Sequence, residues 1–413
     1  MSGLSILQIA HDHPDWTPGG TEIVAHDLAR ALDARADSSC RLLVAATALQ
    51  RPGGEAGRLG AHGDDIVLHT GAYDRFSMAR IDGHAWVEAV GRVLDTLRPD
   101  VVHLHGLDRI GAEIVPAIRR LRPSCRIVLT LHDYQLICPN DGLLLTTTEG
   151  ARCRGAQPDA CRRCFPELGA ARHALRRAYL LAVLACVDRF IAPSAFLRDR
   201  FVAWGLDADR IDVVPNAVAR DAQTNGSELP RTRRDRFAYF GTIAPHKGLL
   251  VLLDAAARLQ DARARVALHG GLAWADASFR DAFAAGMKHA GAAVQHFGPY
   301  DRADVVGLMR LADWIVVPSI WWENAPLVIE EARAAGRPVI CSAIGGMAER
   351  VADGVDGLHF PAGDAAALAE VMREATGPDL WARLAGQAAP ASHAAFVGAH
   401  VALYQQLPTR IAA

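Results

Sequence analysis

The sequence predicts an α/β protein built from two doubly wound, parallel-sheet domains, and three observations support this fold class. Short runs rich in Val, Ile, Leu and Ala alternate with helical patterns along the whole of the 413-residue chain. Most of these runs are apolar at every position, which is typical of strands buried on both faces of a parallel sheet. A polar segment with Gly and Pro, residues 219–235, divides the chain into two halves that both show this alternation.

The apolar runs place the strands in order. In the first half we expect strands at residues 6–10, 41–46, 66–69, 101–105, 127–132, 189–192 and 211–214. In the second half we expect them at residues 237–240, 265–269, 294–297, 314–317, 338–342 and 358–360. Helical patterns lie between strands, for example at residues 21–34, 85–97, 249–259 and 326–335.

These elements define a first domain at residues 1–218 and a second at residues 235–390. The C-terminal segment, residues 391–413, carries a last helical stretch at residues 392–406. We allow for that helix crossing back to the first domain, which the sequence itself does not show. Facing sheet domains form a cleft, and ligands of such domains bind beyond the carboxyl ends of the strands.

Composition and charge exclude several classes of protein. Hydrophobic residues make up 51% of the chain and charged residues 22%, an ordinary globular balance. The formal net charge of −2 argues against a nucleic-acid partner, which needs a broad basic face. The first apolar run is too short for a signal peptide, and no run approaches the ~20 residues of a membrane-spanning helix. We therefore expect a cytoplasmic protein.

The strongest functional pattern follows a buried strand of the second domain and runs Glu323-Asn-Ala-Pro-Leu-Val-Ile-Glu-Glu331. Pro326 suits the first position of a helix, with Asn324 or Ala325 before it as the cap. The N-terminus of that helix offers N–H groups to a phosphate. Glu323 and Glu331 accept hydrogen bonds only, so they suit two polyols such as a sugar and a ribose. The structural alternative is a capped amphipathic helix with a solvated pair of glutamates.

A second pattern, Tyr239-Phe-Gly-Thr-Ile-Ala-Pro-His-Lys-Gly-Leu249, follows the first strand of the second domain. Gly241 permits a close approach of the backbone to a ligand, and Lys247 supplies a positive charge for a phosphate. Gly248 is expected at the entry of the next helix. A surface lysine beside a turn is the structural alternative.

Three strand ends of the first domain carry glycine or histidine. Gly19 and Gly20, in Pro18-Gly-Gly-Thr-Glu22, would line the ligand site, although a lone glycine pair is usually a turn. His105 ends a second strand, and Thr130-Leu-His132-Asp133-Tyr134 ends a third. A histidine in such a place can bond a sugar hydroxyl or share a proton, and is about as often purely structural.

Taken together, these motifs resemble the retaining glycosyltransferases of family 4 (group 1), which have the GT-B fold. The likeness covers essentially the whole chain, and it extends to Gly345-Gly-Met-Ala-Glu349 and Asp353-Gly-Val-Asp-Gly-Leu358. It implies two Rossmann-like domains facing a cleft. It also implies transfer of a sugar from a nucleotide diphosphate sugar to an acceptor hydroxyl with retention of configuration, as in polysaccharide, glycolipid or other glycoconjugate biosynthesis.

The resemblance assigns roles to the quoted residues. Glu323 would contact the donor sugar, Glu331 the ribose, and Lys247 the leaving diphosphate. Thr242 stands where the family usually has a second cation, an arginine. The expected catalytic residues are His132, Lys247 and Glu323. The expected donor-binding residues are Gly19, Gly20, Thr242, Lys247, Gly270, Phe297, Glu323, Asn324, Ala325, Leu327, Val328 and Glu331. The expected acceptor-side residues are His105, Asp133 and Tyr134.

No Asp-x-Asp motif flanks a strand end, so we expect catalysis without a metal, with Lys247 and helix amides stabilising the leaving group. The acceptor would be a glycan, a lipid-linked molecule or a small molecule. An alternative function is a catalytically silent nucleotide-sugar-binding subunit on the same fold, which Thr242 keeps open. A dinucleotide oxidoreductase is a distant third, because the Gly-x-Gly-x-x-Gly fingerprint does not follow the first strand.

Two further segments have open interpretations. The connection at residues 134–166 contains Cys138, Cys153, Cys161 and Cys164, and the last two have zinc-knuckle spacing. A structural zinc ion, unbound thiols and a disulfide all fit this pattern. A basic and then apolar stretch at residues 171–184 would contact the membrane peripherally or, as the structural alternative, would be a buried helix with a solvated basic end.

Overall fold

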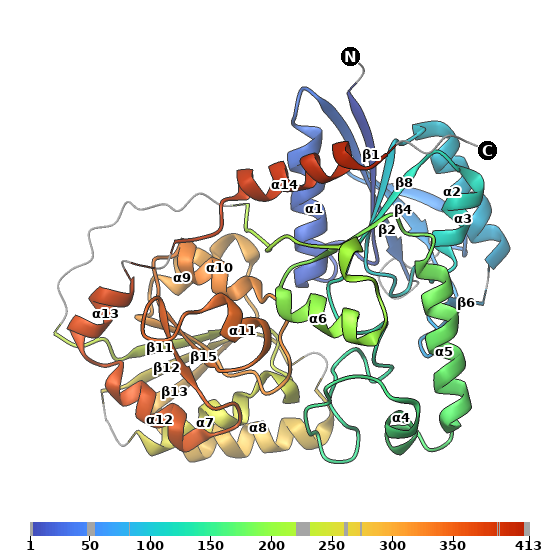
Figure 1. The fold of residues 1–413 in the computed structure, drawn as a ribbon. Coiled ribbons are helices and arrows are strands. Elements are labelled where there is room, and N and C mark those ends of the chain that lie inside the picture. The colour runs from blue at the N-terminus through green and yellow to red at the C-terminus, as the bar shows by residue number, and fades with distance from the viewer. Residues whose placement is uncertain are drawn as a thin grey trace. The chain divides into compact units, whose positions relative to one another are not determined.

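The computed structural model describes residues 3–47, 54–81, 83–219, 232–259, 263–272, 275–385, 387 and 389–408. Most of the predicted linker, residues 220–231, lies outside the described residues. The chain forms two compact units, one made of Met1–Asn216 with His393–Ala413 and the other of Ala217–Ser392. Each unit is a mainly parallel sheet with helices packed on it (Figure 1).

The first unit contains an eight-stranded sheet in the order β10-β9-β8-β7-β1-β2-β4-β3. Its strands are β1 (Leu4–Ala10), β2 (Ser38–Ala46), β3 (Leu59–His62), β4 (Asp65–His69), β7 (Val101–His105), β8 (Arg126–Thr130), β9 (Arg189–Ala192) and β10 (Ile211–Val213). All strands predicted for the first half are present. The sequence analysis missed β3, which pairs antiparallel with β4, and the small hairpin of β5 (Tyr73–Asp74) and β6 (Ala79–Arg80).

Helices cover both faces of this sheet, with α1 and α14 on one face and α2, α3 and α5 on the other (Figure 1). Their bounds are α1 (Gly20–Asp33), α2 (Gly83–Leu97), α3 (Ile114–Leu121), α4 (Pro158–Cys164), α5 (Gly169–Leu184), α6 (Ala195–Trp204) and α14 (His393–Gln406). The last helix, α14, is part of the first unit because Tyr404 is fully buried there. Its hydroxyl lies 2.6 Å from Nδ1 of His103 and accepts from Nε2 of Gln8 at 3.3 Å.

The second unit contains a six-stranded sheet in which every pairing is parallel, in the order β13-β12-β11-β14-β15-β16. Its strands are β11 (Arg236–Phe240), β12 (Arg265–His269), β13 (Val294–Gly298), β14 (Trp314–Val317), β15 (Val339–Ser342) and β16 (Gly357–Phe360). Its helices are α7 (Leu249–Arg258), α8 (Ala277–Ala290), α9 (Val305–Met309), α10 (Leu327–Ala334), α11 (Gly345–Arg350), α12 (Ala365–Glu374) and α13 (Pro378–Ala385).

Strand β11 shows why the central runs are apolar at every position. Phe237 and Tyr239 belong to one buried cluster, whereas Ala238 and Phe240 belong to another. Successive side chains of a strand point to opposite faces, so both faces of this sheet are covered. Helices α7, α8 and α12 contribute to the first cluster, and α9 and α10 to the second.

The strand order places one topological switch point in each unit. In the second unit, β12 and β13 extend the sheet on one side of β11, and the chain then returns to form β14 on the other side. In the first unit, β1 has β2 on one side and β7 on the other. Loops that leave the carboxyl ends of such neighbouring strands diverge and leave room for a ligand. A ligand site is therefore expected at the loops after β11 and β14 in the second unit, and at the loops after β1 and β7 in the first.

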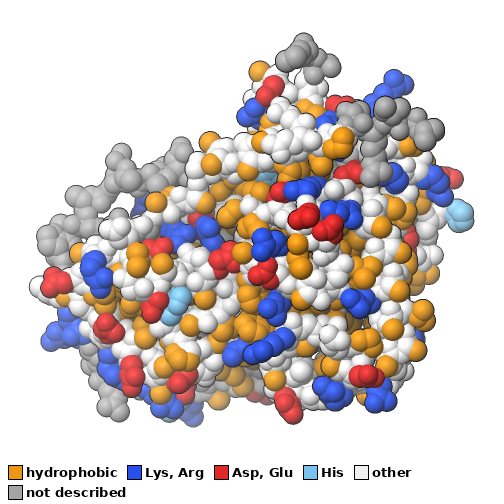
Figure 2. All heavy atoms as spheres, in the orientation of Figure 1, with side chains coloured by type: hydrophobic (Ala, Val, Ile, Leu, Met, Phe, Trp, Pro, Cys, Tyr) orange, Lys and Arg blue, Asp and Glu red, His pale blue; other side chains and the backbone are white. Residues whose placement is uncertain are grey.

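Two expectations about partners, the absence of nucleic-acid binding and a peripheral membrane contact, concern the surface of the protein. On the face shown in Figure 2, Lys and Arg side chains are interspersed with Asp and Glu side chains. In α5 the apolar end is buried through Leu180, Val183 and Leu184, as the structural alternative to a membrane contact requires. Among the helices of the described residues, none is both long enough and apolar enough to cross a lipid bilayer.

Gly248 is needed at the entry of α7, as its sequence context predicts. It has φ of 73° and ψ of 21°, the left-handed conformation. A Cβ atom built there would lie 1.9 Å from the carbonyl oxygen of Pro318. The loops after β11 and β14 can touch at this point only because residue 248 has no side chain.

We therefore expect Gly248→Ala to lower the free energy of unfolding by at least about 3 kcal/mol, because a backbone clash adds to the ~1–2 kcal/mol of a left-handed alanine. The matched control is Gly336→Ala, which has φ of 70° and no atom within 4 Å of the added Cβ. Urea unfolding should show the control losing only the ~1–2 kcal/mol of the left-handed conformation. Equal losses in the two variants would contradict the clash.

Candidate functional site

The glutamate that the sequence analysis singled out lies at the switch point of the second unit. Glu323 is in the loop after β14 and is 6% exposed. Its Oε1 accepts from Nζ of Lys247 at 2.7 Å and from Oγ of Ser319 at 2.7 Å. Lys247 belongs to a short 3-10 turn, Pro245–Lys247, in the loop after β11. The structure thus brings together two predicted catalytic residues from neighbouring strand ends.

The charge of Glu323 is held by this pairing. Burial alone would raise the pKa of its carboxyl group, but the Lys247 ammonium and the hydrogen bonds from Lys247 and Ser319 outweigh burial and leave the pKa below its usual value. A second element fixes the backbone, since the Gly346 N–H donates to the Glu323 carbonyl at 2.7 Å. A Cβ on Gly346 would lie 1.5 Å from the Asn324 carbonyl oxygen, so α11 packs directly against this loop.

The cap of the following helix differs from the prediction. We expected Pro326 at the first helical position with Asn324 or Ala325 as the cap. Helix α10 begins at Leu327, and Pro326 is itself the N-cap, with φ of −65° and ψ of 121°. Proline fixes φ but leaves ψ free to take the extended value of a cap. The N–H groups of Leu327 and Val328 are then the first two of the helix, where no acceptor exists within the helix itself.

The two adjacent glutamates of α10 have different surroundings. Glu330 is 2% exposed and accepts from Arg333 at 3.0 Å and from the Ala391 N–H at 2.8 Å, and it also pairs with Arg350. These contacts make Glu330 a structural residue. Glu331 lies near Tyr300, whose phenol pKa is raised by burial and then by the Glu331 charge. Glu331, the predicted ribose contact, is 9% exposed and thus lies closer to solvent than Glu330.

The ends of three neighbouring strands carry a stack of aromatic rings. The Phe240 and His269 rings lie 4.6 Å apart with an interplanar angle of 7°, and the His269 and Phe297 rings lie 4.9 Å apart at 8°. Phe297 is 53% exposed, so it ends the stack at the surface. Gly270 follows β12, and a Cβ on it would lie 1.8 Å from the Gly241 carbonyl oxygen. The stack and the close loops form a flat, rigid edge beside the glutamate loop.

Thr242 stands where the family usually has an arginine, and it is exposed. Its backbone carbonyl oxygen accepts a hydrogen bond from the Tyr239 hydroxyl at 2.7 Å. His246 does not replace the absent cation, because burial and then the Lys247 charge lower its pKa to about 4. At neutral pH this histidine is uncharged.

The first unit assembles a row of buried histidines behind His132. His105, which is fully buried, lies with Nδ1 2.9 Å from Nε2 of His132 and with Nε2 against Oε1 of Gln8. The Gln8 oxygen accepts only, so Nε2 of His105 carries the proton and its Nδ1 accepts from His132. With Nε2 of His132 protonated, Nδ1 is the nitrogen of this ring that carries a lone pair. Burial and the charge of His11 lower the pKa of His132 to about 3, so the ring is neutral.

The three residues predicted on the acceptor side, Asp133, Tyr134 and His105, differ in their burial and contacts. Asp133 is half-buried, and burial raises its pKa to about 6, which gives it a titration near neutral pH. The Tyr134 side chain is fully buried in the core, so the structure does not bring it to the surface where an acceptor would bind. His105 contacts His132 rather than solvent, and it is a positioning residue. Gly19 and Gly20, which were predicted to bind the donor, lie at the start of α1, with Gly19 as its N-cap and Gly20 as its first residue. A Cβ on Gly19 would lie 2.4 Å from Oε2 of Glu22.

One charged pair in this region was missed by the sequence analysis. Nε2 of His11 lies 2.8 Å from Oε1 of Glu22, and the side chains are 14% and 5% exposed. Burial alone would lower the pKa of His11, but the Glu22 carboxylate, with smaller contributions from Asp108 and Asp133, raises it to about 9. His11 is thus a cation at neutral pH. Its position directly after β1 was the available signal.

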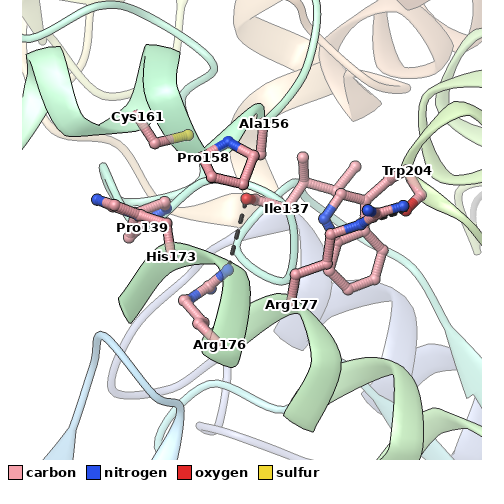
Figure 3. A pocket seen from close by; sticks show the side chains of 9 residues that line it. All are labelled: Ile137, Pro139, Ala156, Pro158, Cys161, His173, Arg176, Arg177 and Trp204. Carbon is pink, nitrogen blue, oxygen red and sulfur yellow. Dashed lines mark hydrogen bonds between the residues drawn. The ribbon is translucent and has the colours of Figure 1, made fainter. Parts of the chain in front are cut away.

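The cysteine-containing connection is held by Arg176 of α5. Arg176 donates to the carbonyls of Leu136 at 2.8 Å and Gln135 at 2.6 Å, and it is 6% exposed. In Figure 3 the guanidinium points toward Ile137, to which a dashed line marks a hydrogen bond. Both residues line a cavity of only about 10 Å³. That volume fits about one water molecule. The cavity is too small for a sugar, and Arg176 acts here as a structural anchor.

The four cysteines of this connection lie near one another without a disulfide. All eight cysteines of the chain are free thiols. Burial and then the neighbouring thiols, Cys138 first, raise the pKa of Cys161 to about 11. No three of the four cysteines have sulfur atoms that all lie within 4.8 Å of one another. The structural zinc ion stays a prediction for Cys138, Cys153, Cys161 and Cys164.

The His11–Glu22 pair predicts a pH-dependent stability. A histidine whose pKa is higher in the folded state stabilises the fold below about pH 6.5, and this contribution is lost as the pH rises through about 9. The pair should contribute up to about 3 kcal/mol. Urea unfolding from pH 6 to 10 should show this loss in the wild type and not in Glu22→Gln. Parallel profiles for the two proteins would contradict a charged His11.

Comparisons with known proteins extend these observations. Residues 18–222 match the family described as Glycosyltransferase Family 4, and residues 234–376 match Glycosyl transferases group 1. Over 199 residues the chain is 36% identical to the D-inositol 3-phosphate glycosyltransferase of Mycolicibacterium smegmatis, and this segment is 45% of each protein. The enzyme of that name from Mycobacterium tuberculosis (strain F11) is 35% identical over 189 residues, 42% of this chain and 38% of the relative. The matched segments thus span less than half the length of these relatives.

Solved structures share the fold over nearly the whole chain. HepE of Anabaena, determined in complex with UDP and glucose, has a TM-score of 0.66 at 17% identity and covers 97% of this chain and 98% of its own. Sucrose-phosphate synthase of Thermosynechococcus elongatus has a TM-score of 0.67 at 20% identity and covers 98% and 99%. Two parallel-sheet α/β units, these likenesses and the two family matches lead to one conclusion: the chain has the GT-B fold and belongs to the group 1 glycosyltransferases of family 4.

Proposed function

We propose that the protein transfers a sugar from a nucleoside diphosphate sugar to an acceptor hydroxyl and that the anomeric configuration is retained. The observation that carries this proposal is the charged pair of Lys247 and Glu323, which lies at the switch point of the second unit directly before α10. HepE, which shares the fold, was determined with UDP and with UDP-glucose. The curated relatives are named as glycosyltransferases.

The diphosphate would bind between the Lys247 ammonium and the first N–H groups of α10. An ammonium has three donors, so Lys247 can keep its bond to Glu323 and still donate to phosphate oxygens. The N–H groups of Leu327 and Val328 add neutral donors and the positive end of the helix dipole. As the bond between sugar and phosphate breaks, negative charge grows on the phosphate, and these preorganised donors lower the barrier.

Glu323 and Glu331 would bind the two polyols of the donor. Glu323 is kept ionised by Lys247 and Ser319, and an ionised carboxylate accepts strongly from sugar hydroxyls. Glu331 would accept from the ribose. The exposed face of Phe297 offers a surface on which a nucleobase can stack, at ~1–3 kcal/mol per base. Gly270 and Gly241 keep the neighbouring loops close to this ring.

The first unit would bind the acceptor, a glycan, a lipid-linked molecule or a small molecule of glycoconjugate biosynthesis. The pKa of His132, lowered by burial, keeps its ring neutral, and a neutral imidazole at a strand end suits a site for a polar, uncharged sugar. In the proposed front-face reaction, the acceptor oxygen forms its bond to the anomeric carbon as the carbon–phosphate oxygen bond breaks. The acceptor proton passes to the leaving phosphate oxygen, so no protein nucleophile and no metal ion is required.

A catalytically silent nucleotide-sugar-binding subunit remains the second candidate function, because Thr242 replaces one of two cations that clamp the diphosphate. In that case the donor site would bind a nucleoside diphosphate weakly and without turnover.

The proposed activity is tested by incubating the protein with UDP-, GDP- and ADP-sugars and following nucleotide release and the anomeric proton of the product. We expect turnover with one donor and retention of configuration. Glu323→Gln should lower kcat by about 100- to 1000-fold while nucleoside diphosphate affinity changes only a few-fold, because the glutamate contacts the sugar. The control is Glu370→Gln, an exposed residue of α12. Nucleotide binding without turnover by the wild type would favour the silent subunit.

Restoring the absent cation gives a second test. Thr242→Arg should tighten binding of the preferred nucleoside diphosphate about 10-fold, because a charge-assisted bond to phosphate is worth ~1.5–3 kcal/mol. Thr242→Met, with a long uncharged side chain, should leave the Kd within about two-fold. Calorimetric titration measures both. If the arginine variant binds no more tightly at low salt, Thr242 does not face the diphosphate.

A further inference from the structure

A cluster of metal-ligating side chains lies in the first unit and takes no part in the proposed reaction. It consists of His13 and Asp15 in the loop after β1, His62 at the end of the edge strand β3, and Asp65 at the start of β4. The ligand atoms of His13, Asp15 and His62 all lie within 4.8 Å of one another. We call these four residues the histidine–aspartate cluster.

The contacts within the cluster match the spacing of metal ligands. Nδ1 of His13 lies 3.5 Å from Oδ2 of Asp15, and Nε2 of His62 lies 2.8 Å from the same oxygen. Ligands placed ~2.0–2.1 Å from a tetrahedral zinc ion are about 3.3 Å apart. The two distances to Asp15 Oδ2 lie on either side of this spacing, and the two imidazole nitrogens lie within 4.8 Å of each other, so side-chain rotations would bring the three atoms around one ion.

A buried carboxylate orients the central histidine for this task. Nε2 of His13 lies 3.2 Å from Oδ2 of Asp65, and both side chains are 4% exposed. A carboxylate accepts only, so Nε2 carries the proton and Nδ1 keeps its lone pair on the side of Asp15 and His62. Metal-binding histidines characteristically donate their other N–H to such a carboxylate. The Asp15 N–H now donates to Nδ1 at 3.1 Å, and a metal ion would take its place.

We propose that the histidine–aspartate cluster binds one divalent ion of the zinc type through His13 Nδ1, Asp15 Oδ2 and His62 Nε2, with Asp65 as the partner that orients His13. Two imidazoles and one carboxylate suit zinc and its transition-metal neighbours rather than magnesium or calcium. Asp15 is 64% and His62 29% exposed, so the fourth position faces solvent and holds water. This inference does not rest on the proposed function.

A competing set of ligands shares His13. The ligand atoms of His13, His26 and Asp65 also lie within 4.8 Å of one another. Asp65 is already paired with Arg30, so an ion there would sit beside a guanidinium. Among the described residues, the polar side-chain contacts of Asp15 and His62 are to histidine and aspartate side chains and not to a guanidinium. His26 therefore serves as a matched control, because it belongs to the competing set alone.

The consequence of an ion at this place would be local order. It would join the edge strand β3 to the loop that runs from His13 to the start of α1 at Gly20. Trp16 lies in that loop, with its ring 5.3 Å from His13 and 5.0 Å from His62. Fluorescence of Trp16 thus reports on the site, and Trp16→Phe identifies its signal.

The test uses the full-length chain, stripped of metal, in a Cys161→Ser/Cys164→Ser background that removes the second candidate metal site. Zn²⁺ titration by calorimetry should give one site. His62→Gln should raise the Kd by about 100-fold or more, Asp65→Asn by about 10- to 100-fold, and His26→Gln by less than three-fold. Co²⁺ should give visible ligand-field bands without a sulfur-to-metal charge-transfer band.

Thermal unfolding gives a second measure of Zn²⁺ binding, in addition to calorimetry. Saturating Zn²⁺ should raise Tm in the background protein and in His26→Gln, and not in His62→Gln, because only a ligand bound to the folded state stabilises it. A circular dichroism spectrum equal to that of the background shows that each variant is folded. Absence of Zn²⁺ binding in the background, or loss of binding in His26→Gln with binding kept in His62→Gln, would overturn the proposal.

Discussion

The ion pair between Lys247 and Glu323 joins residues 76 positions apart, and it depends on the loops after β11 and β14 being held together. Both partners are largely removed from water, and a buried charge is tolerated only when it is paired and hydrogen-bonded. Lys247 is set by the close contact of Gly248 with Pro318, and Glu323 by the Gly346 N–H. Two backbone approaches that exclude side chains thus position one pair of charges.

The first unit, in contrast, buries several histidines in their neutral form. His103, His105 and His400 are almost fully buried, and burial holds the pKa of each below its ordinary value. The hydrogen bonds from His105 to Gln8 and from His132 to His105 fix the tautomer of each of these two rings. His11 differs from the first three histidines, because the Glu22 carboxylate opposes the cost of burial and raises the pKa of His11.

The apolar runs were sufficient to predict every main strand of both sheets, because strands buried on both faces leave an uninterrupted signal. They missed β3, whose sequence Leu-Gly-Ala-His has no apolar run and which pairs at an edge. The pattern from Glu323 to Glu331 located the glutamate loop, and Lys247 and Gly248 were found from their place after β11. The Lys247–Glu323 bond itself was not predictable, since it depends on how β11 and β14 come to be neighbours.

Residues that act through burial were harder to foresee. Nothing in the sequence separates Glu330, fixed by arginines, from Glu331 next to it. Tyr134 follows His132 and Asp133 closely and still points into the core, because the chain turns there through the bond from the Ile137 N–H to the Tyr134 carbonyl. The charge state of His11 and the meeting of His13 with His62 arise from contacts across the first sheet.

The position of Tyr404 has a consequence for how the chain is made. Its hydroxyl completes the core of the first unit by bonding to His103 and Gln8, yet the whole second unit is translated between them. A ribosome adding ~5–20 residues per second needs on the order of ten seconds or more to reach α14 after finishing β10. During that interval all strands of the first sheet have been synthesised, but the core of the first unit lacks Tyr404 and the rest of α14.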